Sequence, residues 1–296
     1  MNITASSTPE CIFASMNALG EAPFWHEPTQ TLWWIDVRAP NIQCLDPATG
    51  KYRKFGLPTA SVGSWAFRQQ GGMLVSLKDG LYGFDPTSGN ASRLLPLEAE
   101  IEGHRLNDGR PDNKGRFWVG TMHDTVREPT GSFYRVDPDL SVRKAFDLVN
   151  IPNSLAFSAD DKLMYFADSP AKKIWVFDFD LDEGRLSNRR VFVDCAADPG
   201  VPDGSAIDQD GCLWNANYGG GRIVRYTPEG KVDRVIALPV TQPTCCTFGG
   251  AQLDTLYITT ATQRLTPQEL AAQPLAGGLF AMPTSSRGVR VPFFGG

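Results

Sequence analysis

The stretch VPDGSAIDQDGCLWNANYGGGRIVRYTPEG, residues 201–230, decides the fold because it contains one complete repeating unit. A run of apolar and aromatic residues at 212–216 follows a tight turn at 209–211 and is too short to be a helix. A second strand-like run at 223–227 ends in a Pro-Glu-Gly turn. The unit therefore consists of a strand, a loop, a second strand and a turn.

Similar units recur along the whole chain. The starting points of their first strand-like runs are separated by 42, 43, 46, 50 and 43 residues. These starting points are Thr31, Met73, Arg116, Lys162, Cys212 and Thr255. Because a four-stranded propeller blade needs about 40 to 50 residues, we predict an all-β fold, a six-bladed β-propeller. We expect these six runs to be the innermost strands, which line a central channel.

The sequence indicates one domain. No shift in composition and no linker divides the chain, so we expect a single propeller over residues 1–296, with a short N-terminal tail at about residues 1–15. The closest approach to a helix is at residues 267–272. The 29 glycines and 22 prolines agree with a turn-rich β protein.

Composition and charge exclude several classes of protein. With 42% hydrophobic, 10% aromatic and 21% charged residues, the chain can bury a sizeable core. The net charge of −5 provides no basic surface for nucleic acid, and no apolar run is long enough to span a membrane. Because the start of the chain does not resemble a secretory signal, we expect a cytoplasmic protein that is a monomer or a weak homodimer.

Familiar catalytic motifs do not occur in the sequence. There is no Gly-x-Ser-x-Gly, no Gly-x-Gly-x-x-Gly and no Walker loop, which argues against a hydrolase triad or a nucleotide site. The 3 histidines lack a metal-ligand spacing, so a His-rich zinc site is excluded. The 6 cysteines are dispersed without a C-x-x-C pair, and we expect free, mostly buried thiols.

Polar residues occur at equivalent places before the predicted inner strands. Glu21 precedes Thr31 by 10 residues, whereas Asn107, Asn153 and Asp203 each precede their own run by 9 residues. In a closed propeller these four side chains should meet at one rim of the channel. They would present several oxygen ligands and a charge of about −2, which suits a divalent cation. The alternative is that each residue caps its own turn.

Five strings of the sequence carry a resemblance to a known family. They are LGEAPFW (19–25), RLNDGRPDNKGRFWVGTM (105–122), IPNSLAFSADDKLMYFADS (151–169), VPDGSAIDQDGCLWNANYGGGRIVRY (201–226) and CCTFGGAQLDTLYITTA (245–261). In combination they resemble the SMP-30/gluconolactonase/LRE family, also called the regucalcin or sugar-lactonase family. The resemblance implies a six-bladed propeller with one divalent metal ion in its channel. The implied activity is hydrolysis of an aldonolactone of the gluconolactone, xylonolactone or arabinonolactone type to the aldonic acid.

The resemblance also implies a set of metal ligands. The family's ligands correspond to Glu21, Asn153 and Asp203, and Asn107 lies near the metal or the bound sugar. A divalent cation would polarise the lactone carbonyl and lower the pKa of a bound water. Asp203 is the candidate general base, although ligation to a metal would weaken it as a base.

The substrate contacts are assigned in the same way. Arg105 and Asn107 match the family's sugar-binding pair, while His123 and Asp124 stand where several relatives have an acidic contact. His123 would either bond a substrate hydroxyl or be a capped or solvated histidine. Three tryptophans are open to two interpretations, as the floor of a sugar pocket or as core residues. They are Trp25, Trp65 and Trp214.

The identity of the metal and the biological role stay open at this point. Oxygen-rich sites of this charge accept calcium, magnesium, manganese, ferrous iron or zinc. The alternative to a lactonase is a calcium-binding regulatory protein of the regucalcin type with vestigial lactonase activity. An interaction propeller of the WD or Kelch kind would need repeat signatures that the sequence lacks.

Overall fold

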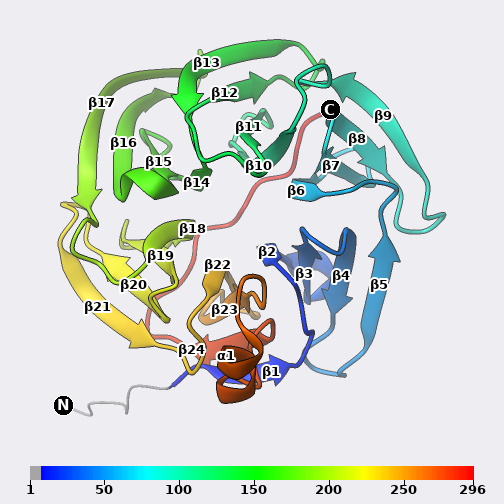
Figure 1. Ribbon diagram of the computed structural model, residues 1–296. Helices are drawn as coiled ribbons and strands as arrows, with labels where there is room; N and C mark the ends of the chain where they lie inside the picture. The colour runs from blue at the N-terminus through cyan, green and yellow to red at the C-terminus, as the bar shows by residue number, and fades with distance from the viewer. Residues whose placement is uncertain (1–7) are drawn as a thin grey trace.

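Six four-stranded antiparallel sheets form a ring around a central channel in the computed structural model, which describes residues 8–296 (Figure 1). This is the six-bladed β-propeller that the repeat predicts. The free cysteines are also confirmed, since all six are unpaired and all except the half-buried Cys11 are buried. Within residues 8–296 no helix is long and apolar enough to cross a membrane.

The blades follow one another along the chain. From first to fourth strand, blade one contains β2 (Gly20–His26), β3 (Thr31–Asp36), β4 (Asn41–Leu45) and β5 (Tyr52–Gly56), blade two β6 (Val62–Phe67), β7 (Met73–Leu77), β8 (Gly80–Phe84) and β9 (Ala91–Pro96), and blade three β10 (His104–Pro111), β11 (Phe117–His123), β12 (Gly131–Val136) and β13 (Val142–Val149). Blade four contains β14 (Pro152–Phe157), β15 (Leu163–Asp168), β16 (Lys173–Asp180) and β17 (Arg185–Asp194), blade five β18 (Val201–Ile207), β19 (Leu213–Tyr218), β20 (Arg222–Tyr226) and β21 (Val232–Ala237), and blade six β22 (Pro243–Gly249), β23 (Thr255–Thr260), β24 (Leu279–Pro283) and β1 (Glu10–Phe13).

Among residues 8–296, helical structure is limited to short segments. Two 3-10 turns, η1 (Glu27–Thr29) and η2 (Ser169–Ala171), each contain a proline in their first turn. The helix α1 (Pro267–Ala272) occupies the segment in which the sequence comes closest to a helix. It begins at a capping box, in which the Thr266 side chain accepts from the Glu269 backbone and the Glu269 side chain accepts from the Thr266 backbone.

The innermost strands differ from those that the sequence predicts. The first strand of each blade packs against the first strands of both neighbouring blades around the channel. The runs predicted to be innermost form the second strands instead, as β3, β7, β11, β15, β19 and β23. The assignment was wrong because the true inner strands are rich in Gly, Pro, Asn and Asp, which are typical of loops.

A break in strand pairing explains this composition. Each inner strand has an irregular register against the second strand of its blade, as a β-bulge produces. The shifts lie between Glu21 and Phe24, Val62 and Ser64, Leu106 and Gly109, Asn153 and Ala156, Pro202 and Ser205, and Pro243 and Cys245. Ala22 and Ser154 adopt left-handed φ angles of 47° and 57° there. The candidate ligands lie at or next to these irregularities, and a bulge at such a position changes the direction of the neighbouring side chains.

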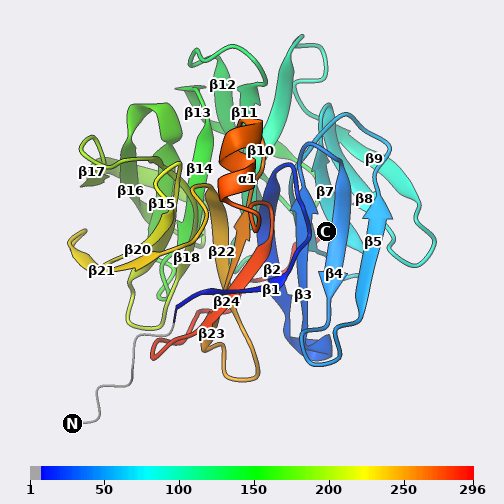
Figure 2. The same ribbon diagram turned by 60° about the horizontal axis from the view of Figure 1, so that its bottom comes forward.

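Blade six is built from two distant parts of the chain. Strand β1 pairs with β24, which makes it the outermost strand of that blade (Figure 2). The predicted tail at about residues 1–15 is therefore wrong for residues 10–13, and residues 1–7 lie outside the described residues. Hydrogen bonds between these distant parts of the chain close the ring. With β1 included, blade six has four strands like the other blades.

The hydrophobic core is divided into six clusters, and each cluster joins two neighbouring blades. The cluster between blades one and two contains Phe24, Trp33 and Trp65, and the cluster between blades five and six contains Trp214 and Phe248. The other four clusters join the remaining pairs of neighbours. Because every blade shares its core with both neighbours, no blade can be displaced without exposing apolar surface.

One end of the channel is crossed by the segment 287–296, which we call the strap (Figure 1). The Val289 amide donates to the Ile207 carbonyl at 3.1 Å, and the Phe294 amide donates to the Phe67 carbonyl at 2.8 Å. Phe294 is fully buried in the core between blades two and three. These contacts anchor the strap to opposite sides of the ring, at the hairpins between first and second strands.

Buried aspartates hold these hairpins in place. In blade five, Asp208 accepts hydrogen bonds from the Cys212 amide at 3.0 Å, from Trp214 Nε1 at 2.8 Å and from Arg225 Nε at 2.8 Å. In blade three, Asp112 accepts in the same way from Arg116 and Trp118. One carboxylate thus fixes the turn, the tryptophan in the core and an arginine of the blade.

We predict that Asp208→Ala lowers the free energy of unfolding by about 3–5 kcal/mol, because Arg225 and Trp214 lose a buried acceptor. The matched control is Asp178→Ala, which removes a half-exposed carboxylate paired with Arg190. It should lower the free energy of unfolding much less than Asp208→Ala does, because an exposed ion pair contributes little to stability. Urea unfolding followed by tryptophan fluorescence measures both values. Equal losses in the two variants would contradict the structural role of Asp208.

Candidate functional site

The open end of the channel holds most of the residues that the sequence predicts for the site. This end, which we call the mouth, is formed by the beginnings of the inner strands and by the loops between second and third strands. A cavity of about 120 Å³ lies there. The predicted residues that line it are Glu21, Arg105, Asn107, Asn153 and Asp203. Circular closure thus brings together side chains from blades one, three, four and five.

Two carboxylates at the mouth are electrostatically unfavourable as they stand. Burial and, to a smaller extent, the nearby charge of Asp108 raise the pKa of Glu21 to about 8, although the Ala22 amide and the charge of Arg105 act in the opposite direction. Burial also raises the pKa of Asp203 well above its usual range, and the charges of Glu21 and Asp108 add to this effect. Within residues 8–296 neither Glu21 nor Asp203 forms an ion pair. The chain therefore buries two carboxyl groups in the channel without a direct ion-pair partner, and the charge of Arg105 offsets the effect on Glu21 only in part.

Asn153 lies beside these carboxylates with its amide held in one orientation. Its Nδ2 donates to Ser169 Oγ at 2.8 Å, and Ser169 Oγ donates in turn to the Pro202 carbonyl at 2.7 Å. Its Oδ1 accepts from Asn107 Nδ2 at 3.1 Å. An amide oxygen has a second lone pair, so Asn153 Oδ1 can still bind a cation.

Asn107 has both ends of its amide engaged by the protein. Its Oδ1 accepts from Arg105 Nη1 at 2.7 Å, and its Nδ2 donates to Asn153 Oδ1 and to the Pro152 carbonyl. In this arrangement Asn107 orients Asn153 and connects it to Arg105. Asn107 also lines the cavity at the mouth.

Arg105 is buried and paired with Asp124. Its Nε donates to Asp124 Oδ1 at 2.6 Å, and Arg38 Nη1 donates to the other carboxylate oxygen at 2.8 Å. Burial alone would raise the pKa of Asp124, but the hydrogen bonds and charges of Arg38 and Arg105 outweigh this and lower it. Asp124 is therefore a carboxylate that positions two arginines rather than a free acid.

His123 does not line the cavity within the described part of the chain. Its Nδ1 accepts from the Val126 amide at 2.9 Å and from the Thr125 amide at 3.3 Å, so the ring caps its own loop. A Cβ on Gly103 would collide with the other side of the ring. The structure thus places His123 in the capped environment that was one of its two interpretations.

The three tryptophans belong to the core. Trp65 donates through Nε1 to the Ala22 carbonyl at 3.0 Å, beneath the bulge that carries Glu21. Trp25 stacks on Tyr257, and Trp214 is bonded to Asp208. Among residues 8–296, none of the three lines the cavity at the mouth. The sequence missed other lining residues, notably Arg38, Arg127 and Arg264, because they lie in loops without a recurring pattern.

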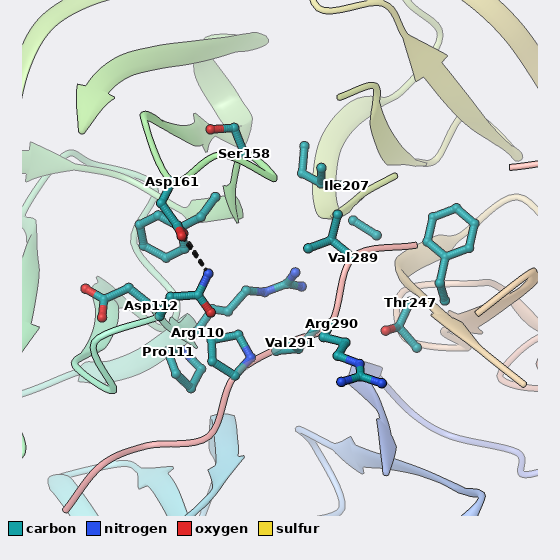
Figure 3. A pocket seen from close by; sticks show the side chains of 15 residues that line it. Arg110, Pro111, Asp112, Ser158, Asp161, Ile207, Thr247, Val289, Arg290 and Val291 are labelled. Carbon is teal, nitrogen blue, oxygen red and sulfur yellow. Dashed lines mark hydrogen bonds between the residues drawn. The ribbon is translucent and has the colours of Figure 1, made fainter. Parts of the chain in front are cut away.

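Asp108 also belongs to the channel although the sequence assigns it no role. Its Oδ2 accepts from the Leu155 amide at 3.0 Å, which ties blade three to blade four. Burial raises its pKa, while the charge of Arg110 opposes the rise. Arg110 in turn donates to the Ser205 carbonyl at 2.9 Å and lines a smaller cavity of about 30 Å³ beneath the strap. Figure 3 shows that cavity, with Val289 and Val291 of the strap beside Arg110.

The donors at the mouth fit a divalent cation. Glu21, Asn153 and Asp203 offer only oxygen atoms, and oxygen ligands with two negative charges suit hard divalent ions. The described residues contain no group of three or more His, Cys, Asp or Glu side chains arranged to bind a metal. A metal here would therefore depend on the amide oxygen of Asn153 as well as on the two carboxylates.

We predict that Glu21→Gln stabilises the metal-free protein at alkaline pH. Because the pKa of Glu21 is raised to about 8 in the folded state, its ionisation has no effect on the free energy of unfolding below about pH 4.5. As the pH rises from about 4.5 to about 8, Glu21 increasingly destabilises the folded state. Above pH 8, chelator-treated Glu21→Gln should be more stable than the unsubstituted chain by about 1 kcal/mol or more. Urea unfolding at pH 4.5 and pH 8.5 measures the difference.

The control for this prediction is Glu229→Gln, at an exposed turn. It should change the free energy of unfolding equally little at both pH values. A Glu21→Gln variant that is less stable at pH 8.5 would contradict the electrostatic description of the mouth.

Comparisons with known proteins agree with the fold. The sequence profile of the SMP-30/Gluconolactonase/LRE-like region matches residues 19–262. The chain is 36% identical over 292 residues to 6-deoxy-6-sulfogluconolactonase of Pseudomonas putida, which covers 98% of this chain and 100% of the relative. It is 34% identical over 277 residues to regucalcin of Xenopus laevis, with 92% of each chain covered.

Solved structures give the same result. The calcium-binding protein regucalcin from Agrobacterium tumefaciens superposes with a TM-score of 0.93 at 29% identity, covering 97% of both chains. A luciferin-regenerating enzyme superposes with a TM-score of 0.91 at 28% identity, covering 98% of this chain and 100% of the other. The resemblance read from the five sequence strings is thereby confirmed. On the evidence of the matching profile, these relatives and the shared propeller, the chain belongs to the SMP-30/gluconolactonase/LRE-like family.

Proposed function

We propose that this chain is a metal-dependent lactonase, a carboxylic-ester hydrolase that opens an aldonolactone to its aldonic acid. The observation that carries the proposal is the pair of buried carboxylates, Glu21 and Asp203, neither of which forms an ion pair within residues 8–296. This pair of carboxylates lines a cavity of about 120 Å³ beside the buried Arg105, and such a polar lining supports a polar substrate. The sulfogluconolactonase relative supports the same reaction class.

The proposed metal ligands are Glu21, Asn153 and Asp203. A bound divalent ion would supply Lewis-acid polarisation of the lactone carbonyl and a lowered pKa for water at the site. The protein fixes the donors in advance, because Asn153 is held by Ser169 and Asn107, and because the bulges set the directions of Glu21 and Asp203. The candidate ions are calcium, magnesium, manganese, ferrous iron and zinc, all of which accept oxygen ligands.

Asp203 is proposed as the general base. Its carboxylate would take a proton from the attacking water as the water oxygen forms a bond to the carbonyl carbon. The bond between the carbonyl carbon and the ring oxygen then breaks, and the proton passes to that oxygen, which becomes a hydroxyl. The Asp203 main-chain carbonyl accepts from Ser154 Oγ at 2.6 Å and from Asn215 Nδ2 at 3.0 Å, so its backbone is anchored during this exchange.

Arg105 is proposed to hold the sugar. Its Nε and Nη1 are occupied by Asp124, Asn107 and the Leu106 carbonyl, whereas within residues 8–296 Nη2 has no hydrogen bond. That nitrogen can donate to a substrate hydroxyl from a guanidinium that is already fixed in place. Asp124 is proposed to act on the substrate indirectly, by holding Arg105 in place. His123 is proposed to contribute indirectly too, by capping the loop that follows it.

A second candidate function is calcium binding for regulation, with little lactonase activity. The oxygen-only ligands suit calcium, and regucalcins are among the relatives. This alternative needs the ligands Glu21, Asn153 and Asp203 but gives no role to the fixed guanidinium of Arg105. The two candidates therefore differ in what a change at Arg105 should do.

We predict that the chelator-treated protein loses hydrolysis of aldonolactones and regains it with one of the five cations. A pH-indicator assay on gluconolactone, xylonolactone and arabinonolactone measures the rate. Asp203→Asn should lower kcat by more than about 100-fold, because both a ligand and the base are lost. The matched control is Asp139→Asn at an exposed turn, which should keep the rate. Failure of every cation to support hydrolysis of any lactone would overturn the proposed activity.

We also predict that Arg105→Lys separates the two candidate functions. A lysine keeps the charge but cannot bond Asp124 and Asn107 through the same fork, so kcat/KM on the preferred lactone should fall about 10- to 100-fold. Calorimetry should find the affinity for the activating cation changed by less than about threefold. Unchanged hydrolysis in this variant would favour the calcium-binding alternative.

A further inference from the structure

Four arginines line the cavity at the mouth, together with the proposed metal ligands. They are Arg38, Arg105, Arg127 and Arg264. Arg105 comes from the inner strand β10, whereas the other three come from loops between the second and third strands of blades one, three and six. Three separate loops thus deliver cationic side chains to a single opening, in a chain whose net charge is −5.

Within residues 8–296, only two of these four arginines form ion pairs. Asp124 binds both Arg105 and Arg38, at 2.6 Å and 2.8 Å. Among residues 8–296, Arg127 donates only to main-chain carbonyls, those of His123 at 3.3 Å and Asp124 at 3.2 Å. Within the described residues, Arg264 forms neither a hydrogen bond nor an ion pair. Arg127 and Arg264 therefore have donors available for a ligand.

Arg127 and Arg264 are also close enough to repel each other. Burial lowers the pKa of Arg127, and the charge of Arg264 lowers it further. Arg264 adopts a left-handed φ of 64° in the loop before α1. Two like charges at one opening are unfavourable unless an anion lies between them.

A neutral sugar lactone would not use this pair. Its reacting carbonyl belongs deep in the mouth, at Glu21, Asn153 and Asp203, where Arg105 already serves the hydroxyls. The outer arginines lie in the loops that surround the entrance, so they would meet the other end of the substrate. Guanidinium groups bind sulfonate, phosphate and carboxylate oxygens through paired hydrogen bonds.

We infer that the preferred substrate is an aldonolactone with an anionic group on the carbon farthest from the lactone carbonyl, and that Arg127 and Arg264 bind this group. The inference rests on the proposed lactonase activity and narrows its substrate class. Arg38 contributes charge, but it is held by Asp124 and is not the principal contact.

The first experiment compares hydrolysis of glucono-1,5-lactone with its 6-phospho and 6-sulfo derivatives and with the lactone of a sugar diacid. The quantity of interest is the ratio of kcat/KM for each anionic lactone to that for the neutral one. We expect this ratio to exceed about 10 in the unsubstituted chain, and to fall at least about 10-fold in the Arg127→Gln/Arg264→Gln double variant. The three anions distinguish phosphate, sulfonate and carboxylate as the natural group.

Arg234→Gln is the matched control, since Arg234 is an exposed arginine on the outermost strand β21. It removes one charge from the same chain and should leave the ratio unchanged. A ratio near 1 in the unsubstituted chain would overturn the inference. Equal losses on neutral and anionic lactones in the double variant would overturn it as well, because the arginines would then act only on the structure of the mouth.

A binding measurement keeps this inference separate from the lactonase proposal. Calorimetry with 6-phosphogluconate and gluconate requires no turnover. Tighter binding of 6-phosphogluconate, lost in the double variant and kept in Arg234→Gln, supports the anionic subsite even if no lactone is hydrolysed. Equal binding of the two acids contradicts it even if gluconolactone is a good substrate.

Discussion

Electrostatic repulsion between buried carboxylates is the constraint on which the rest of this structure depends. Glu21, Asp108 and Asp203 come from three blades, and burial raises the pKa of all three. The charge of Asp108 raises the pKa of both Glu21 and Asp203, and the charge of Glu21 raises that of Asp203. Only a ring that is closed on itself can hold such groups together. The pairing of β1 with β24 and the six hydrophobic clusters between blades stabilise the ring. They offset the unfavourable free energy of burying these carboxyl groups close together.

The channel is layered by charge along its axis. Arg38, Arg127 and Arg264 lie in loops at the mouth, Glu21 and Asp203 lie on inner strands, and Arg110 lies at the cavity beneath the strap, at the opposite end. Arg110 partly balances Asp108, so the uncompensated charge is concentrated at Glu21 and Asp203. The layer that lacks a partner from the chain is the one that a cation would occupy. The cationic layer outside it would select anions that enter from solvent.

Much of the fold could be predicted from the sequence because a repeat of 42 to 50 residues has few structural solutions. The ring, its six blades and the convergence of Glu21, Asn107, Asn153 and Asp203 follow from that period. The innermost strands could not be predicted, because strands that contain bulges have the composition of loops. Strand β1 was also missed, since an isolated four-residue strand has no signal apart from its partner.

Side chains whose roles depend on distant neighbours were the hardest to interpret. The core position of Trp214 follows from Asp208, and the engagement of Asn107 follows from Arg105. No spacing in the sequence connects Arg38, Arg127 and Arg264, because the three loops that carry them differ in length and composition. Their grouping becomes apparent only when the mouth is assembled.

The most direct test of the central claim is a crystal structure of the protein soaked in manganese, with anomalous scattering used to locate the ion. The account predicts one strong peak in the channel, within about 2.6 Å of carboxylate oxygens from Glu21 and Asp203 and of Asn153 Oδ1. A channel without such a peak, or a peak that contacts only one of these three side chains, would contradict it.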